Sequence, residues 1–242
     1  MKNELIIILL LWGSGVIWAQ EKRFAGVPSD NVIQNYLTET KMYATLYSGK
    51  IATPYDMRFE NHPYFESNTY VSGTLGYNRA VYKNVLMRFD LYRNELTVIS
   101  PERPYNIVID NEKFDFAVLN GSTIVLSVSG RKSKEQFHVL LQNGTYPIVK
   151  NFNIVIVEDT SDRLVKTTFR IQQQYAIYID GVPYPVKNKN SVLKLFADRR
   201  KELNEYAKQH KLNFRNQLEQ SIIALVNHYE NLTNVKTDLS LQ

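Results

Sequence analysis

Apolar and polar residues alternate with a period of two over most of the chain, from about residue 43 to 188. Between Val85 and Leu91 the odd positions are apolar, whereas Arg88 and Asp90 lie on the opposite face. Alternation of this kind predicts strands with one face buried. The same pattern recurs at residues 96–98, 105–109, 114–118, 124–128, 137–141, 148–156 and 175–179.

Short turn signals separate these predicted strands. Asn120-Gly121, Asn143-Gly144 and Asp180-Gly181 are dipeptides typical of tight hairpins, because both positions tolerate a positive φ angle. Arg93-Asn94 and Asn111-Glu112 provide further turns. Strands joined by short turns are antiparallel neighbours, so the pattern predicts an antiparallel meander that is open or curled into a partial barrel.

The period changes to three and four residues from Ser191 onward. Ser191 is a candidate N-cap for a first helix, Asp198 for a second, and Asn213 can open a last one. The last helix carries one apolar stripe, which predicts burial of that face. Its apolar positions are Phe214, Leu218, Ile222, Leu225, Tyr229 and Leu232.

We therefore expect an α+β protein, in which an antiparallel β-rich domain (20–190) precedes two to three C-terminal helices packed on the sheet (191–234). Residues 235–242 are expected to form a frayed tail. An alternative for the apolar stripe of the last helix is docking on a partner.

The N-terminus has the pattern of a secretory signal peptide over residues 1–19. Lys2 precedes an apolar run from Leu5 to Trp12, and small residues lead to Ala19. The run is shorter than the roughly 20 apolar residues of a membrane span. We expect an exported protein, periplasmic or secreted in a Gram-negative type of cell, with no transmembrane segment after cleavage.

Composition narrows the chemistry. The chain has no cysteine, which excludes a thiol nucleophile, a cysteine-based zinc site and the lipid attachment of a lipoprotein. The net charge of +5 is interspersed, and even Arg199-Arg200-Lys201 is followed by Glu202, so nucleic acid is not an expected partner. The 16 tyrosines fit half-buried strands first, and they are also compatible with stacking on sugars.

One segment has residue types that could support catalysis or metal binding. Asp56, Glu60 and His62 stand at alternate positions around Arg58, and Glu66 follows shortly after. Carboxylates and an imidazole on one face can serve as acid and base. The alternative interpretation is a solvated edge strand or loop, because prolines at 54 and 63 bracket the segment.

Other signatures of enzymes do not occur. The four histidines lack metal-ligand spacing. The mature region has no serine in a G-x-S-x-G context, no phosphate-binding loop and no dinucleotide fingerprint. We therefore expect no metal and no cofactor.

The second half resembles a group of secreted, functionally uncharacterised proteins of Bacteroidetes bacteria. The resemblance rests on the strand from Tyr175 to Lys187, on Ser191–Phe196, on the charged segment 199–203 and on Leu225–Glu230. The strand from Tyr82 to Tyr92 is also similar to that group. The resemblance implies a strand-rich body with a Lys-rich helical tail and a periplasmic or exported location; it implies no catalytic residues.

The leading functional hypothesis is a non-catalytic binding or interaction protein of the cell envelope, with an envelope protein, a glycan or a lipid as partner. One alternative is a carrier of lipid or another apolar ligand. It requires that the odd positions from Val85 to Leu91 and the even positions from Phe114 to Val118 line one concave cavity. The other alternative is an envelope hydrolase that uses Asp56, Glu60 and His62.

Overall fold

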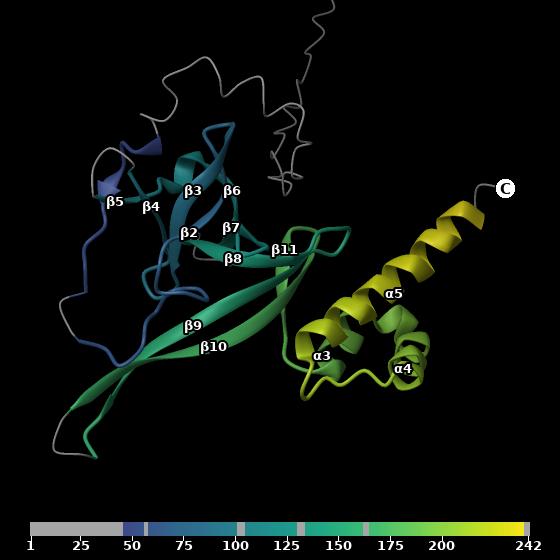
Figure 1. Ribbon diagram of the computed structural model, residues 1–242. Helices are drawn as coiled ribbons and strands as arrows, with labels where there is room; N and C mark the ends of the chain where they lie inside the picture. The colour runs from purple at the N-terminus through teal and green to yellow at the C-terminus, as the bar shows by residue number, and fades with distance from the viewer. Residues whose placement is uncertain (1–45, 56–57, 101–104, 130–133, 162–164, 240–242) are drawn as a thin grey trace, which may run out of the picture.

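The computed structural model describes residues 46–55, 58–100, 105–129, 134–161 and 165–239 (Figure 1). The predicted signal peptide lies outside these residues. Eleven strands form one open antiparallel sheet, in the order β1-β5-β4-β3-β2-β6-β7-β8-β9-β10-β11. Three helices follow it, which confirms the predicted α+β class. The strands are β1 (Lys50–Ile51), β2 (Val71–Tyr77), β3 (Ala80–Asp90), β4 (Glu95–Ile99), β5 (Asn106–Val108), β6 (Phe114–Leu119), β7 (Ser122–Ser129), β8 (Lys134–Gln142), β9 (Ile148–Asp159), β10 (Lys166–Ile179) and β11 (Val182–Val186).

Two of the three predicted tight hairpins are present. Asn120 and Gly121 both have positive φ angles, of 50° and 76°, between β6 and β7. Asp180 and Gly181 have the same pair of angles between β10 and β11. Asn143-Gly144 begins a longer connection between β8 and β9 instead, in which the Tyr146 N–H donates to the Glu230 carboxylate (3.0 Å).

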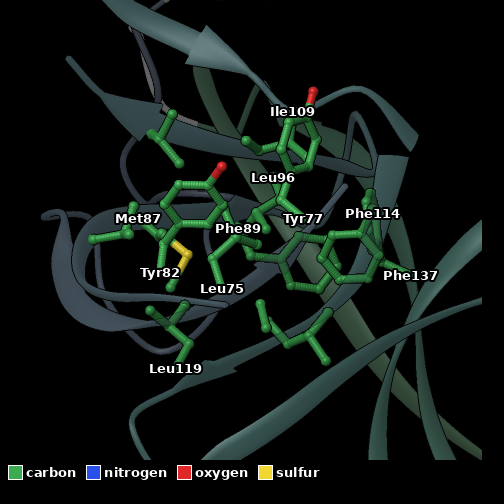
Figure 2. Packing of buried hydrophobic residues seen from close by; sticks show 14 of the residues in the cluster. Leu75, Tyr77, Tyr82, Met87, Phe89, Leu96, Ile109, Phe114, Leu119 and Phe137 are labelled. Carbon is green, nitrogen blue, oxygen red and sulfur yellow. The ribbon is translucent and has the colours of Figure 1, made fainter. Parts of the chain in front are cut away.

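The larger core lies inside the curled part of the sheet, from β2 to β8. On β3, Val85, Met87 and Phe89 are at most 2% exposed and belong to the same cluster. Figure 2 shows Tyr82, Met87 and Phe89 packed with Leu75 and Leu96. These side chains fill the interior, so the packing gives no support to a cavity for apolar cargo at the odd positions of β3.

On β6 the predicted face, which was the even positions from Phe114 to Val118, is wrong at two positions. Phe114 belongs to this core, but Phe116 and Val118 do not. The later core residues of β6 are Ala117 and Leu119. A register shift between β2 and β6 at Gly76/Tyr77 changes which residues point inward. Phe116 instead packs over Gly76, where a Cβ atom would lie within 2.6 Å of the ring.

The β9–β10 hairpin extends away from the rest of the sheet (Figure 1). The two strands pair with each other from Ile148↔Ile177 to Asp159↔Lys166. By contrast, β8 and β9 pair only where β8 ends and β9 begins, from Gln142↔Ile148 to Val139↔Lys150. The sheet therefore forks between β8 and β9.

The helices cover one side of the sheet near β9–β11. They are α3 (Lys189–Leu195), α4 (Arg200–Gln209) and α5 (Leu218–Leu239), with a 3-10 turn η3 (Ala197–Arg199) between the first two. Val192, Leu203 and Leu225 form a second core with Ile148 and Ile177 of the sheet. The middle of the predicted apolar stripe, at Ile222, Leu225 and Tyr229 of α5, is thus buried within the chain. Within the described residues, no helix is long and apolar enough to cross a membrane.

The helix boundaries differ from the prediction. Asn188, and not Ser191, caps α3; Ser191 lies at the third helical position and completes a capping box with Asn188. α4 begins after Arg199 without a side-chain cap. Asn213 caps a turn, through hydrogen bonds to its side chain, and α5 begins at Leu218. The backbone of α5 remains helical to Leu239, beyond residue 234.

Candidate functional site

A cavity of about 320 Å³ lies on the face of β3 and β4 that points away from the larger core. Arg88 is opposite Thr97 in the β3–β4 ladder, and Asp90 is opposite Glu95, so the four side chains share one face. Residues 52–55 and Tyr64 complete the wall. We call this space the Tyr–Arg cavity.

The chain before β2 is held beside the end of β3. Tyr64 forms a bridge with Asp90, and the Phe65 N–H donates to the Phe89 carbonyl (2.9 Å). The Leu91 N–H donates in turn to the Pro63 carbonyl (3.0 Å). These main-chain bonds fix Tyr64 at the cavity, although its segment has no strand periodicity.

Arg88 is held between two tyrosine rings. Its guanidinium carbon lies 3.8 Å from the ring centroid of Tyr64 and 4.5 Å from that of Tyr70. Nη1 donates to the Asn68 carbonyl (2.9 Å), and Nε is buried without a hydrogen bond in the described part of the chain. Cation–π contacts on both sides therefore orient a guanidinium that keeps one free donor.

Arg93 is fixed in a similar way. Its guanidinium carbon lies 3.9 Å from the ring centroid of Tyr55, and it donates to the carbonyls of Thr53 and Pro54. Arg93 belongs to the β3–β4 turn, so these contacts tie the turn to the chain before β2.

Asp90 is the central carboxylate and is only 4% exposed. It accepts hydrogen bonds from the Tyr55 hydroxyl (2.8 Å), the Tyr92 N–H (3.0 Å) and the Arg93 N–H (2.9 Å). These bonds compensate for removing the charge from water. Burial first, and then the bond to Asp90, raise the pKa of Tyr55; burial also raises the pKa of Tyr64. Both phenols are therefore protonated at neutral pH.

Two half-buried polar side chains of the wall, Glu95 and Asn106, have no hydrogen bond among the described residues. With Arg88, Arg93 and Asp90, they give the wall two positive and two negative charges, which balance. The cavity thus offers donors, acceptors and aromatic faces without a net charge, an arrangement that suits binding of a polar neutral molecule.

An aromatic cluster joins the cavity to the projecting hairpin. Phe169 of β10 stacks on Phe59 with ring centroids 4.2 Å apart, and it contacts Tyr55 and Tyr92 at 5.5 Å each. Tyr92 is 44% exposed at the edge of this cluster. The cavity therefore lies where the curled sheet, the chain before β2 and the hairpin meet.

Of the candidate residues from the sequence that the structure describes, one contacts a residue of this cavity, His62. Asp56 is outside the described residues. Glu60 and Glu66 are exposed, and His62 is half-buried with its ring stacked on Tyr64 at 6.0 Å. Within the described part of the chain, no group of three or more His, Cys, Asp and Glu residues could hold a metal ion.

The same segment instead binds the edge of β10. The Asn61 side chain donates to the Phe169 carbonyl (2.8 Å) and accepts from the Phe169 N–H (2.7 Å). The Glu60 N–H donates to the Thr167 carbonyl (3.0 Å). The segment thus pairs like an edge strand, while the predicted acid–base chemistry of Asp56, Glu60 and His62 stays a prediction.

Sequence reasoning did not identify Arg88, Asp90 and Arg93 as site residues. The available signal was a positive and a negative charge two positions apart on the outward face of one strand, next to a turn with a further arginine. Tyr55 and Tyr64 could not have been assigned, because no periodicity places their segment against β3.

The chain matches no protein-family model, no curated protein and no solved structure. Its function must therefore be argued from the site itself.

Proposed function

We propose that the protein is an exported, non-catalytic binding protein of the cell envelope, and that the Tyr–Arg cavity binds a neutral saccharide. The cavity volume of about 320 Å³ is at the lower end of the range of about 300–1,000 Å³ for small-molecule sites. This size suits one unit of a glycan whose neighbouring units extend across the surface.

The observation that supports this proposal is the mixture of fixed and free polar groups. A sugar presents hydroxyl groups that both donate and accept, and it presents apolar C–H faces. The free Arg88 Nε is a donor, the Glu95 carboxylate is an acceptor, and the Asn106 amide is both. Tyr55 and Tyr64 line the cavity, and the solvent-exposed Tyr92 contacts the adjoining aromatic cluster.

The charge balance favours a neutral sugar over an acidic one. An acidic ligand would gain from Arg88 and Arg93 but would also meet Glu95 and the buried Asp90. Both guanidiniums already lie against tyrosine rings and donate to main-chain carbonyls. Some of their N–H donors are therefore already used and are not free for a carboxylate or a phosphate.

Isothermal titration calorimetry tests the proposal. We expect the protein to bind cellotriose, a neutral β-1,4-linked glucose trimer, and to bind trigalacturonic acid more weakly. Glu95→Ala and Asn106→Ala should each weaken cellotriose binding at least tenfold without lowering the unfolding midpoint, because neither side chain has a bond to lose.

The matched control is Glu205→Ala, which removes the same charge from an exposed position on α4. It should leave binding unchanged. Failure to bind any neutral trimer, whether of glucose or of N-acetylglucosamine, or tighter binding of trigalacturonic acid, would contradict the proposal.

A further inference from the structure

A second cavity, of about 200 Å³, lies at the fork between β8 and β9. The β8–β9 ladder ends at Val139↔Lys150, and the Asn94 side chain enters the gap beyond it. Asn94 accepts from the Phe137 N–H (2.9 Å) and donates to the Glu135 carbonyl (3.2 Å). The Asn94 amide thus bonds to main-chain groups of β8 that β9 would otherwise pair with, and it keeps β8 and β9 apart. We call this space the fork cavity.

The fork cavity contains buried polar atoms that are not satisfied. His138 is 1% exposed, and neither ring nitrogen has a well-formed hydrogen bond in the described part of the chain. The Oδ1 atom of Asn151 is also buried without a well-formed hydrogen bond among the described residues, although the Asn151 side chain is close enough to the ring to affect its pKa. Such groups are costly to bury and are uncommon in folded proteins. Both side chains line the fork cavity.

The groups around the fork cavity are chiefly neutral. Burial lowers the pKa of His138 to about 4, and the nearby Asn151 amide opposes this only in part, so that the ring is uncharged at neutral pH. It then has one donor and one acceptor nitrogen. Gln136, Asn151 and Asn153 contribute amides, and no carboxylate lines the space. One imidazole without carboxylates is a poor set of metal ligands. The set does fit a small neutral group that both donates and accepts hydrogen bonds, such as an amide.

Arg93 connects the two cavities. It lines the Tyr–Arg cavity on one side of the β3–β4 turn and the fork cavity on the other. The fork cavity is smaller than the usual site for a whole small-molecule ligand. Its size suits one substituent of a ligand that is bound in the Tyr–Arg cavity. A saccharide in the Tyr–Arg cavity would therefore need an amide substituent to use both.

We propose that the fork cavity is a subsite for the acetamido group of an N-acetylated amino sugar, with His138 and Asn151 as its hydrogen-bonding residues. This inference rests on the proposed saccharide binding and specifies the class of sugar. The carbonyl of the acetamido group would accept from the imidazole N–H, and its N–H would donate to the Asn151 Oδ1 atom.

The test compares two trimers with the same linkage. In calorimetric titrations we expect chitotriose, the β-1,4-linked trimer of N-acetylglucosamine, to bind at least tenfold more tightly than cellotriose. His138→Leu and Asn151→Leu should abolish this preference while cellotriose affinity is retained. Asn153→Ala is not expected to change it, because the exposed Asn153 lies at the margin of the cavity.

A measurement on the unmodified protein removes any dependence on the folding of the variants. In saturation-transfer difference NMR, the acetyl methyl protons of chitotriose should receive the strongest saturation. Equal binding of the two trimers, or a preference that persists in both leucine variants, would overturn the subsite and leave the saccharide proposal intact. Binding of neither trimer would overturn both.

Discussion

The two cavities beside the β3–β4 turn share Arg93 but differ at their buried ionisable groups, Asp90 in the first and His138 in the second. In the Tyr–Arg cavity, the buried Asp90 accepts three hydrogen bonds, and both guanidiniums lie against tyrosine rings. In the fork cavity, both ring nitrogens of His138 and the Oδ1 atom of Asn151 are buried without a well-formed hydrogen bond in the described part of the chain. The first set stabilises the fold, whereas the second opposes it. Groups of the second kind have no structural benefit of their own, which is why they point to a ligand.

The largest expected effect is at Asp90. Asp90→Ala removes three hydrogen bonds to a buried carboxylate and should lower the free energy of unfolding by about 3 kcal/mol, as measured by urea denaturation. Asp115→Ala is the control, because this exposed carboxylate accepts one bond, from the Arg79 N–H (2.9 Å). Similar losses in the two variants would contradict the central role of Asp90.

Acid should destabilise the protein through His138. Its pKa is about 4 in the folded protein and 6.5 in an unfolded chain, so between these values the unfolded chain binds more protons. Stability then falls as the pH is lowered from about 6.5 to 4, by up to about 3 kcal/mol. The measurement is the difference in urea stability between wild type and His138→Leu across this range. A constant difference would show that His138 does not titrate in this way.

Asn94 should contribute stability by holding the fork. Asn94→Gly keeps a residue suited to the positive φ of 56° but removes the bonds to β8, and it should cost about 2 kcal/mol. Asn120→Gly provides the comparison, because Asn120 also has a positive φ (50°) and has no side-chain hydrogen bond within the described residues. The control should change thermal stability little, and equal effects at both positions would argue against the strand-like role of Asn94.

The smallest effect has the opposite sign. Asn151→Leu replaces a buried, unsatisfied carbonyl oxygen by an apolar group, and it should leave stability unchanged or raise it by about 1 kcal/mol. Thermal unfolding monitored by circular dichroism is sufficient to measure it. A loss of more than 1 kcal/mol would mean that Asn151 is satisfied in solution and that the two cavities do not differ as described.

Much of the fold follows from local pattern. The alternation in β3 predicted its buried face, and Asn120-Gly121 and Asp180-Gly181 predicted two hairpins, because these signals involve neighbouring residues only. Phe116 shows the limit. Its orientation depends on a register shift against β2, and alternation within β6 alone carries no information about such a shift.

The site was harder to predict, because it depends on contacts between distant segments. Tyr55 bonds to Asp90 across 35 residues, and Asn61 bonds to Phe169 across 108. The fork was not predictable either, since the alternation of β8 and β9 continues where their pairing ends. The segment from Glu60 to Glu66 was singled out for its side chains, but in the structure Asn61 and the main chain make its contacts with β10.

A crystal structure of the protein grown with chitotriose tests the central claim most directly. We predict one sugar ring in the Tyr–Arg cavity, with hydroxyl groups bonded to Glu95, Asn106 and the Arg88 Nε atom. An acetamido group should lie in the fork cavity, within hydrogen-bond distance of His138 and Asn151. A saccharide bound elsewhere on the surface, or both cavities without sugar at a saturating concentration, would contradict the account.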